Sequence, residues 1–142
     1  MTDARRAIEG LLVAYVAGID AGDFAAVGAL FEHGEVWDTS GRVARGAEVG
    51  ERIARFARIY ADGTPRTRHL MSNVLIDVDE AADMATSSSS VMVLQAVEGE
   101  FPLQPIFVGG YEDEFVRVDG AWRFACRRRR ADLVGDLTHH RR

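Results

Sequence analysis

Apolar residues recur with a helical period in the first part of the chain. Within residues 2–19, six of them recur at spacings of three and four: Ile8, Leu11, Leu12, Tyr15, Val16 and Ile19. Residues spaced in this way share one face of a helix, so the pattern predicts an amphipathic first helix. After a break at residues 20–23, Asp23 is a suitable N-cap for a second, short helix with four inward residues, Phe24, Val27, Leu30 and Phe31.

Two short β-prone runs follow this helix pair. Residues 35–39 and 42–45 flank the turn dipeptide Ser40-Gly41, which predicts a small hairpin. Between Ala47 and Tyr60 the apolar residues again recur at helical steps, so we expect a third helix there.

The second half of the chain has the pattern of a β-sheet. A loop signal at residues 62–65 precedes long β-prone segments at residues 66–78, 84–97, 106–118 and 121–132. Asp119-Gly120 is typical of a two-residue hairpin turn, and Gly109-Gly110 predicts a bulge that bends its strand. Helices followed by a long antiparallel sheet indicate an α+β fold. The curved sheet would wrap around the N-terminal helices and leave a cone-shaped interior for a small molecule.

Composition and charge narrow the class of protein. The 142 residues carry a formal net charge of -5 and one cysteine, and all 17 basic residues are arginine. A chain of this size and acidity is expected to form one domain, residues 1–142, and to bind no nucleic acid. We expect residues 133–142 to be a flexible tail. The lone cysteine and the absence of a long apolar run predict a cytoplasmic protein with no membrane partner.

Histidines are the first candidates for acid-base chemistry. His139 and His140 lie in the polar tail and His33 follows the second predicted helix, so we expect all three to be solvated. His69 lies inside a predicted strand, where strict alternation places Asn73 on the same face.

Asp20, at the end of the first predicted helix, is the candidate partner of His69. A carboxylate at a helix C-terminus is slightly unfavourable and benefits from a hydrogen-bond donor. If one ring nitrogen of His69 donates to Asp20, the tautomer is fixed and the other nitrogen is poised as a general base. On these residues alone, a histidine that is merely hydrogen-bonded in the core stays an open alternative. Tyr15 is equally open between a core role and a site role.

Three strings of the sequence resemble a known family. AYVAGIDAGDFAAVGALF, RHLMSN and GAWRFACRR are similar to the SnoaL-like branch of the nuclear transport factor 2-like superfamily. Within that branch, the chain resembles the subgroup of scytalone dehydratase, hexachlorocyclohexane dehydrochlorinase and bile acid 7α-dehydratase. The resemblance extends from about Ala7 to Asp132 and implies the cone-shaped, cystatin-like α+β barrel.

The resemblance also implies a set of site residues. The catalytic Asp and His of these relatives match Asp20 and His69, their Tyr matches Tyr15, and their Asn matches Asn73. An Arg on their last strand, which helps to bind the substrate or the departing group, matches Arg127. The second pocket His and the paired substrate-binding Tyr residues of scytalone dehydratase have no counterpart, which argues against a melanin-pathway substrate.

The implied activity is that of a lyase of the dehydratase type, or a related isomerase. It would remove a proton from a small hydrophobic, cyclic substrate and would need no cofactor and no metal. Two other classes compete with this interpretation. One is a noncatalytic module that binds a small hydrophobic molecule. The other is a structural subunit resembling the small subunit of ring-hydroxylating dioxygenases.

Some positions stay open at the level of the sequence. Trp37, Asn73 and Ser88 are the remaining polar candidates for substrate binding. Arg127 begins a run of four arginines, and alternation alone does not decide whether Arg127 or Arg128 faces the interior.

Two further expectations concern burial and assembly. Cys126 is expected to be a small buried residue, because no activating base is evident beside it. Apolar residues on the second face of residues 66–78 predict a homo-oligomer, in which a dimer is favoured over a trimer.

Overall fold

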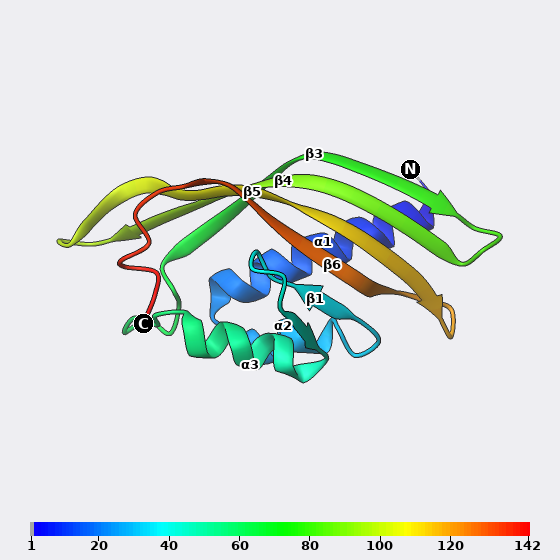
Figure 1. The fold of residues 1–142 in the computed structure, drawn as a ribbon, viewed down its shortest axis with the longest axis horizontal. Helices are drawn as coiled ribbons and strands as arrows, with labels where there is room; N and C mark the ends of the chain where they lie inside the picture. The colour runs from blue at the N-terminus through cyan, green and yellow to red at the C-terminus, as the bar shows by residue number, and fades with distance from the viewer. Residues whose placement is uncertain (1) are drawn as a thin grey trace.

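The computed structural model, which describes residues 2–142, has helices on one side of a long curved sheet (Figure 1). The helices are α1 (Asp3–Ala21), α2 (Phe24–Ala29) and α3 (Ala47–Phe56). The strands are β1 (Glu35–Trp37), β2 (Val43–Arg45), β3 (Thr67–Asp79), β4 (Met84–Val97), β5 (Phe101–Val118) and β6 (Ala121–Val134). This is the predicted α+β arrangement.

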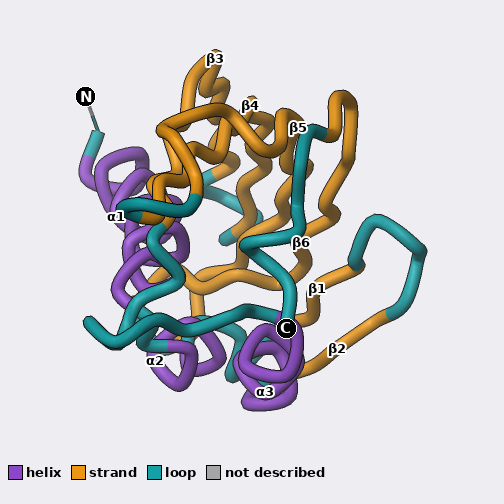
Figure 2. Tube along the Cα trace, turned by 90° about the vertical axis from the view of Figure 1, so that its left-hand side faces the viewer, coloured by secondary structure: helices purple, strands orange, loops and turns teal. Residues whose placement is uncertain are grey.

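The sheet is mostly antiparallel and open. Its strand order is β2-β1-β6-β5-β4-β3, and among the pairings of the described residues only that of β1 with β6 is parallel. Figure 2 shows the long strands curving over the helices, with β1 and β2 extending the sheet along one side. The face toward the helices is called the inner face below, and the opposite face is the outer face.

Local sequence signals explain where the helices begin and end. The Thr2 side chain accepts a hydrogen bond from the Arg5 amide, and the Asp23 side chain caps α2 by accepting from the Ala26 amide at 3.1 Å. Gly22 ends α1 in the left-handed conformation (φ 76°), and a Cβ there would lie 2.2 Å from the Gly63 carbonyl oxygen. The loop after α3 therefore packs closely against the end of α1.

The third helix is shorter than predicted. It ends at Phe56 instead of Tyr60, because Ala57 is extended and forms a β-bridge with Arg141 near the C-terminus. The periodic apolar pattern continues past the helix end, but a tertiary pairing overrides it.

Bulges interrupt three of the long strand pairings. The β3–β4 register shifts between Ser72 and Leu75, where Asn73 has a positive φ of 53°. The β5–β6 register shifts twice, and each time the extra residue lies on β6: Asp132, next to the partner of Gly109, and Ala125. Each bulge changes which residues face inward beyond it, and this decides the composition of the site.

The last residues fold back onto the molecule. Strand β6 continues to Val134, and Gly135 then donates a hydrogen bond to the Ile106 carbonyl at 2.8 Å. In Figure 2 the C-terminus lies beside α3. Residues 133–142 thus have defined contacts with the rest of the protein. Their predicted flexibility concerns motion and stays a prediction.

Candidate active site

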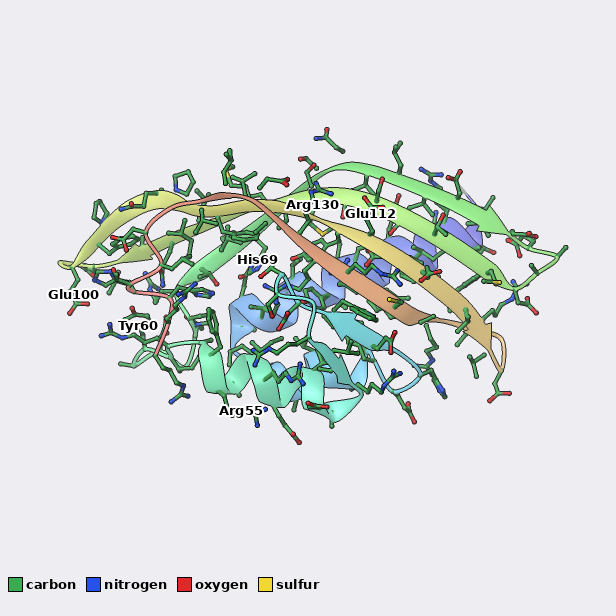
Figure 3. All side chains as sticks on the ribbon, viewed as in Figure 1. Arg55, Tyr60, His69, Glu100, Glu112 and Arg130 are labelled. Carbon is green, nitrogen blue, oxygen red and sulfur yellow. The ribbon has the colours of Figure 1, made fainter. Side chains whose placement is uncertain are left out.

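Asp20 and His69 lie in direct contact on the inner side of the sheet. The Nδ1 atom of His69 is 2.6 Å from Oδ1 of Asp20, and the His69 backbone amide donates to Oδ2 at 2.7 Å. The Thr67 hydroxyl donates to Oδ1 at 2.9 Å. The two side chains are nearly buried, with 8% of His69 and 11% of Asp20 exposed. Figure 3 shows His69 between the sheet and the helices.

This contact defines the tautomer of His69. An ionised carboxylate only accepts hydrogen bonds, so Nδ1 is the protonated nitrogen that donates to Asp20. Within residues 2–142, Nε2 has no hydrogen-bond partner. In the neutral imidazole, the second nitrogen then carries the lone pair, as a general base requires.

Two elements bring the pair together. Asp20 lies in the last turn of α1, and all three of its donors come from the first residues of β3. The donors offset the unfavourable position of a carboxylate at the negative end of the helix dipole. The same contacts fasten the end of α1 to the edge strand of the sheet.

Arg127 is the centre of a second cluster. Its guanidinium forms a two-point ion pair with Asp113, through Nε at 2.7 Å and Nη2 at 2.9 Å, and both side chains are fully buried. Ser87 adds a hydroxyl to Asp113 at 3.1 Å. The Nη1 atom is buried and has no partner in residues 2–142.

Aromatic rings enclose the Arg127 guanidinium. Its central carbon lies 4.4 Å from the ring centre of Tyr15 and 3.7 Å from that of Tyr111. Burial lowers the pKa of Arg127, but the adjacent Asp113 carboxylate offsets this, so the pKa stays above its ordinary value. Burial also raises the pKa of the Tyr111 hydroxyl, so both groups keep their protons.

The two clusters lie along the same helix but do not touch through hydrogen bonds. Tyr15 and Asp20 are five residues apart on α1, which corresponds to about 7.5 Å along the helix axis. The structure thus joins Asp20 with His69 and Tyr15 with Arg127, in two neighbouring groups.

The bulge at Ala125 in β6 determines which arginine faces inward. It places Arg127 on the inner face near Phe124, with the guanidinium 5.0 Å from that ring centre. Arg128 lies on the outer face, where it pairs with Glu114 at 3.2 Å. Cys126 is buried, as expected, and burial raises the pKa of its thiol.

Three candidate binding residues lie on the outer face, away from the dyad, and for Asn73 this corrects the expectation that it shares a face with His69. Trp37 pairs with Arg128 across the β1–β6 ladder, and the Arg128 guanidinium lies 5.7 Å from its ring centre on the outer face. The bulge in β3 turns Asn73 outward, and its amide lies 3.4 Å from the hydroxyl of Ser90. Ser88 also faces outward, because the inner serines of β4 are Ser87 and Ser89.

Several residues near the site escaped the sequence analysis. Thr67 lies two residues before His69 on the same strand, so the alternating pattern already predicts that both side chains face inward. Asp113 and Tyr111 alternate with charged residues, and no local signal marks them as inner. His140 was expected to be solvated, but its Nδ1 atom is buried and its ring packs against Phe56.

The described hollows lie away from the Asp20–His69 pair, and the larger one is bordered by Ser87 and Asp113 of the Arg127 cluster. A groove of about 330 Å³ on the outer face is bordered by Leu75, Asp77, Ser88, Glu112 and Arg128 among others, and one of about 200 Å³ adjoins it. Neither is lined by Asp20, His69 or Arg127. Around Arg127 the predicted cone-shaped interior is filled by aromatic side chains.

Two further features of residues 2–142 concern metal binding and membranes. No group of three or more His, Cys, Asp or Glu side chains there is arranged to hold a metal ion. None of the helices described is long and apolar enough to span a bilayer.

Comparison with known proteins assigns the family. The model of the SnoaL-like domain matches residues 1–128. The chain belongs to the SnoaL-like family. Solved structures similar to this SnoaL-like protein include ones described as cystatin-like and nuclear transport factor 2-like, which confirms the predicted fold class. No curated protein matched the chain in the sequence search.

Three solved structures illustrate the likeness. A protein of unknown function from Mycobacterium tuberculosis is 29% identical, with a TM-score of 0.73 over 92% of this chain and 73% of that one. A protein named as a candidate scytalone dehydratase from Novosphingobium aromaticivorans is 28% identical, with a TM-score of 0.72 over 94% and 87%. The hexachlorocyclohexane dehydrochlorinase of Novosphingobium barchaimii is 20% identical, with a TM-score of 0.73 over 95% and 90%, and shares the fold.

Proposed function

We propose that this SnoaL-like protein removes a proton from carbon in a small hydrophobic, cyclic substrate. The reaction is an elimination of the dehydratase type or a related isomerisation. The observation that carries the proposal is the hydrogen bond from His69 to Asp20, which leaves Nε2 of His69 without a partner in residues 2–142. Similar structures named as a dehydratase and a dehydrochlorinase support elimination over other proton-transfer reactions.

The proposed step begins at Nε2 of His69. This nitrogen takes a proton from the carbon next to a carbonyl group, and the electrons of the broken C–H bond form a double bond. A hydroxide or halide departs with the electrons of its own bond to carbon. A departing hydroxide takes the proton back from the imidazolium and leaves as water, and with a halide the imidazolium releases its proton to solvent. Asp20 stabilises the imidazolium that forms, and a positioned base of this kind contributes about 10² to 10⁴ in rate.

Arg127 and Tyr15 are proposed to stabilise the negative charge that develops. The Arg127 Nη1 atom is buried and has no hydrogen-bond partner within residues 2–142. It can therefore donate a hydrogen bond to an oxyanion or halide. The axial separation of about 7.5 Å between Tyr15 and Asp20 is comparable to the length of a substituted six-membered ring. All the groups in this scheme are side chains, so the proposed reaction uses no cofactor or metal. We place it in the cytoplasm.

A substrate screen tests the proposal. Cyclic β-hydroxyketones and hydroxysteroids are incubated with the wild-type protein, and loss of water is followed by ultraviolet absorbance of the enone product. Turnover should be abolished in His69→Ala and Asp20→Asn and unchanged in His33→Ala, which alters an exposed histidine elsewhere. Tight retention of a hydrophobic ligand that both dyad variants leave unchanged, with no turnover, would instead support a binding module.

A further inference from the structure

The C-terminal segment, defined here as residues 136–142, is fastened to the loop that follows α3. The Arg58 amide donates to the His140 carbonyl at 2.9 Å, and the Arg142 amide donates to the Phe56 carbonyl at 3.0 Å. Ala57 and Arg141 form the β-bridge between them. Figure 1 shows the end of the chain, in red, beside this loop.

A second attachment ties the segment to the sheet beside the dyad. The buried Gln95 amide nitrogen donates to the His139 carbonyl at 3.0 Å, and the Tyr60 hydroxyl donates to the same oxygen. Gln95 pairs with Thr67 across the β3–β4 ladder, and the Thr67 hydroxyl donates to Asp20. One residue thus links the C-terminal segment to the strand position that holds the dyad.

These attachments fix the His140 ring on a segment that Gln95 joins to the strand position beside the dyad. The ring meets Phe56 edge-on, with the ring centres 5.6 Å apart. Its Nδ1 atom is buried and, within residues 2–142, has no hydrogen-bond partner. A buried polar atom without a partner destabilises the protein unless a ligand or water bonds to it.

Burial and the surrounding charges keep His140 neutral near neutral pH. Burial lowers its pKa to about 4, and the groups His69 on β3, Arg129 on β6 and Arg141 on its own segment act in the same direction. Asp20 on α1 opposes them. A neutral imidazole can donate a hydrogen bond, and the nearby arginines favour a partner with partial negative charge.

We propose that His140 is a third polar member of the site and that its Nδ1–H binds the carbonyl or hydroxyl oxygen of a ligand held against His69. The choice of ligand class rests on the proposed function. The position of His140 does not depend on turnover, so binding can be measured separately from catalysis.

The test compares two probes of similar shape. Cyclohexanone has a carbonyl oxygen, and methylenecyclohexane has a CH₂ group in its place. Their Kd values are measured by NMR titration for the wild type and for His140→Phe, which keeps an aromatic ring against Phe56 and removes both nitrogens. Cyclohexanone should bind roughly fivefold to tenfold more weakly to the variant, and methylenecyclohexane should bind equally to both.

The matched control is His139→Phe. This residue lies in the same segment, its ring stacks on Phe101 at 4.5 Å, and its attachment to Gln95 uses the backbone. It should leave both Kd values unchanged. An equal change for the two probes, no change for either, or no binding of cyclohexanone to the wild type would overturn the proposal.

A measurement on the wild type covers the case in which His140→Phe does not fold. Cyclohexanone should shift the ¹⁵N resonance of His140 Nδ1, and methylenecyclohexane should leave it in place. Failure of the proposed function alone would give a different result. No substrate would then be turned over, while cyclohexanone would still bind more tightly to the wild type than to His140→Phe. Turnover with an unaltered kcat and Kd in His140→Phe would remove the His140 proposal alone.

Discussion

At the scale of single residues, Arg127 shows how a charge is accommodated inside this fold. The guanidinium has no exposed surface. It donates two hydrogen bonds to the Asp113 carboxylate, and aromatic rings pack against it. A buried charge requires such compensation, because transfer out of water costs several kcal/mol per ion. The pairing therefore stabilises the fold and the site together.

Removal of one partner of this pair should be strongly destabilising. Arg127→Met leaves Asp113 as a buried, unpaired carboxylate, so the free energy of unfolding should fall by about 3–5 kcal/mol. Arg128→Met is the matched control, because Arg128 is half exposed and pairs on the outer face; it should change stability by about 0.5 kcal/mol or less. Urea unfolding measures both. Equal effects of the two substitutions would contradict the assignment of Arg127 to the inner face.

At the scale of elements, regular periodicity was readable from the sequence and its interruptions were not. The apolar stripe of the first helix, the Asp23 cap and the Asp119-Gly120 turn all occur as predicted, since each depends on local chemistry. The contact between Asp20 and His69 joins residues far apart in the chain, and it was reached through family resemblance together with the need of Asp20 for a donor.

Bulges and long-range pairings limited the rest of the prediction. Alternation places Asn73 beside His69 only if β3 is regular, and the bulge reverses its direction. A similar bulge in β6 determines the inner arginine. The burial of His140 depends on backbone pairing with the loop after α3, for which the polar tail contains no local signal.

The C-terminal segment should make the protein sensitive to acid. In the folded state the pKa of His140 lies near 4, below its ordinary value of 6.5, so the unfolded chain binds more protons between these pH values. The free energy of unfolding should therefore decrease as the pH falls through this window, by up to about 3 kcal/mol from this group.

A variant isolates this contribution. Urea unfolding at several pH values between 4 and 6.5 should show a smaller loss of stability on acidification for His140→Phe than for the wild type. The control His139→Phe should follow the wild type. Parallel curves for His140→Phe and the wild type would show that His140 is not held in its neutral form.

At the scale of the whole molecule, an apolar row crosses the outer face of the sheet. The cross-strand pairs Leu70–Met92, Met92–Val108 and Val108–Leu133 align these four residues across β3, β4, β5 and β6. Leu70 is 45% exposed and Leu133 is 67% exposed. Burial of this row against a second copy would remove apolar surface from water, as in the predicted homodimer.

Light scattering tests this assembly. The wild type should have twice the mass of the 15.6 kDa chain at micromolar concentration, and the double substitution Leu70→Glu, Leu133→Glu should shift it to the monomer. Val13→Glu is the control, since Val13 is also exposed but lies on α1. A monomeric wild type would contradict the prediction, and a dimer that survives the double substitution would exclude this row as its interface.

The central claim is that His69, oriented by Asp20, removes a proton from carbon next to a carbonyl group. Hydrogen-deuterium exchange of the α-protons of cyclohexanone in D₂O, followed by ¹H NMR, measures this step without a leaving group. The wild type and His33→Ala should accelerate the exchange, and His69→Ala and Asp20→Asn should reduce the acceleration by about 10² to 10⁴. Exchange as fast in the dyad variants as in the wild type, or no acceleration by the wild type, would contradict the account.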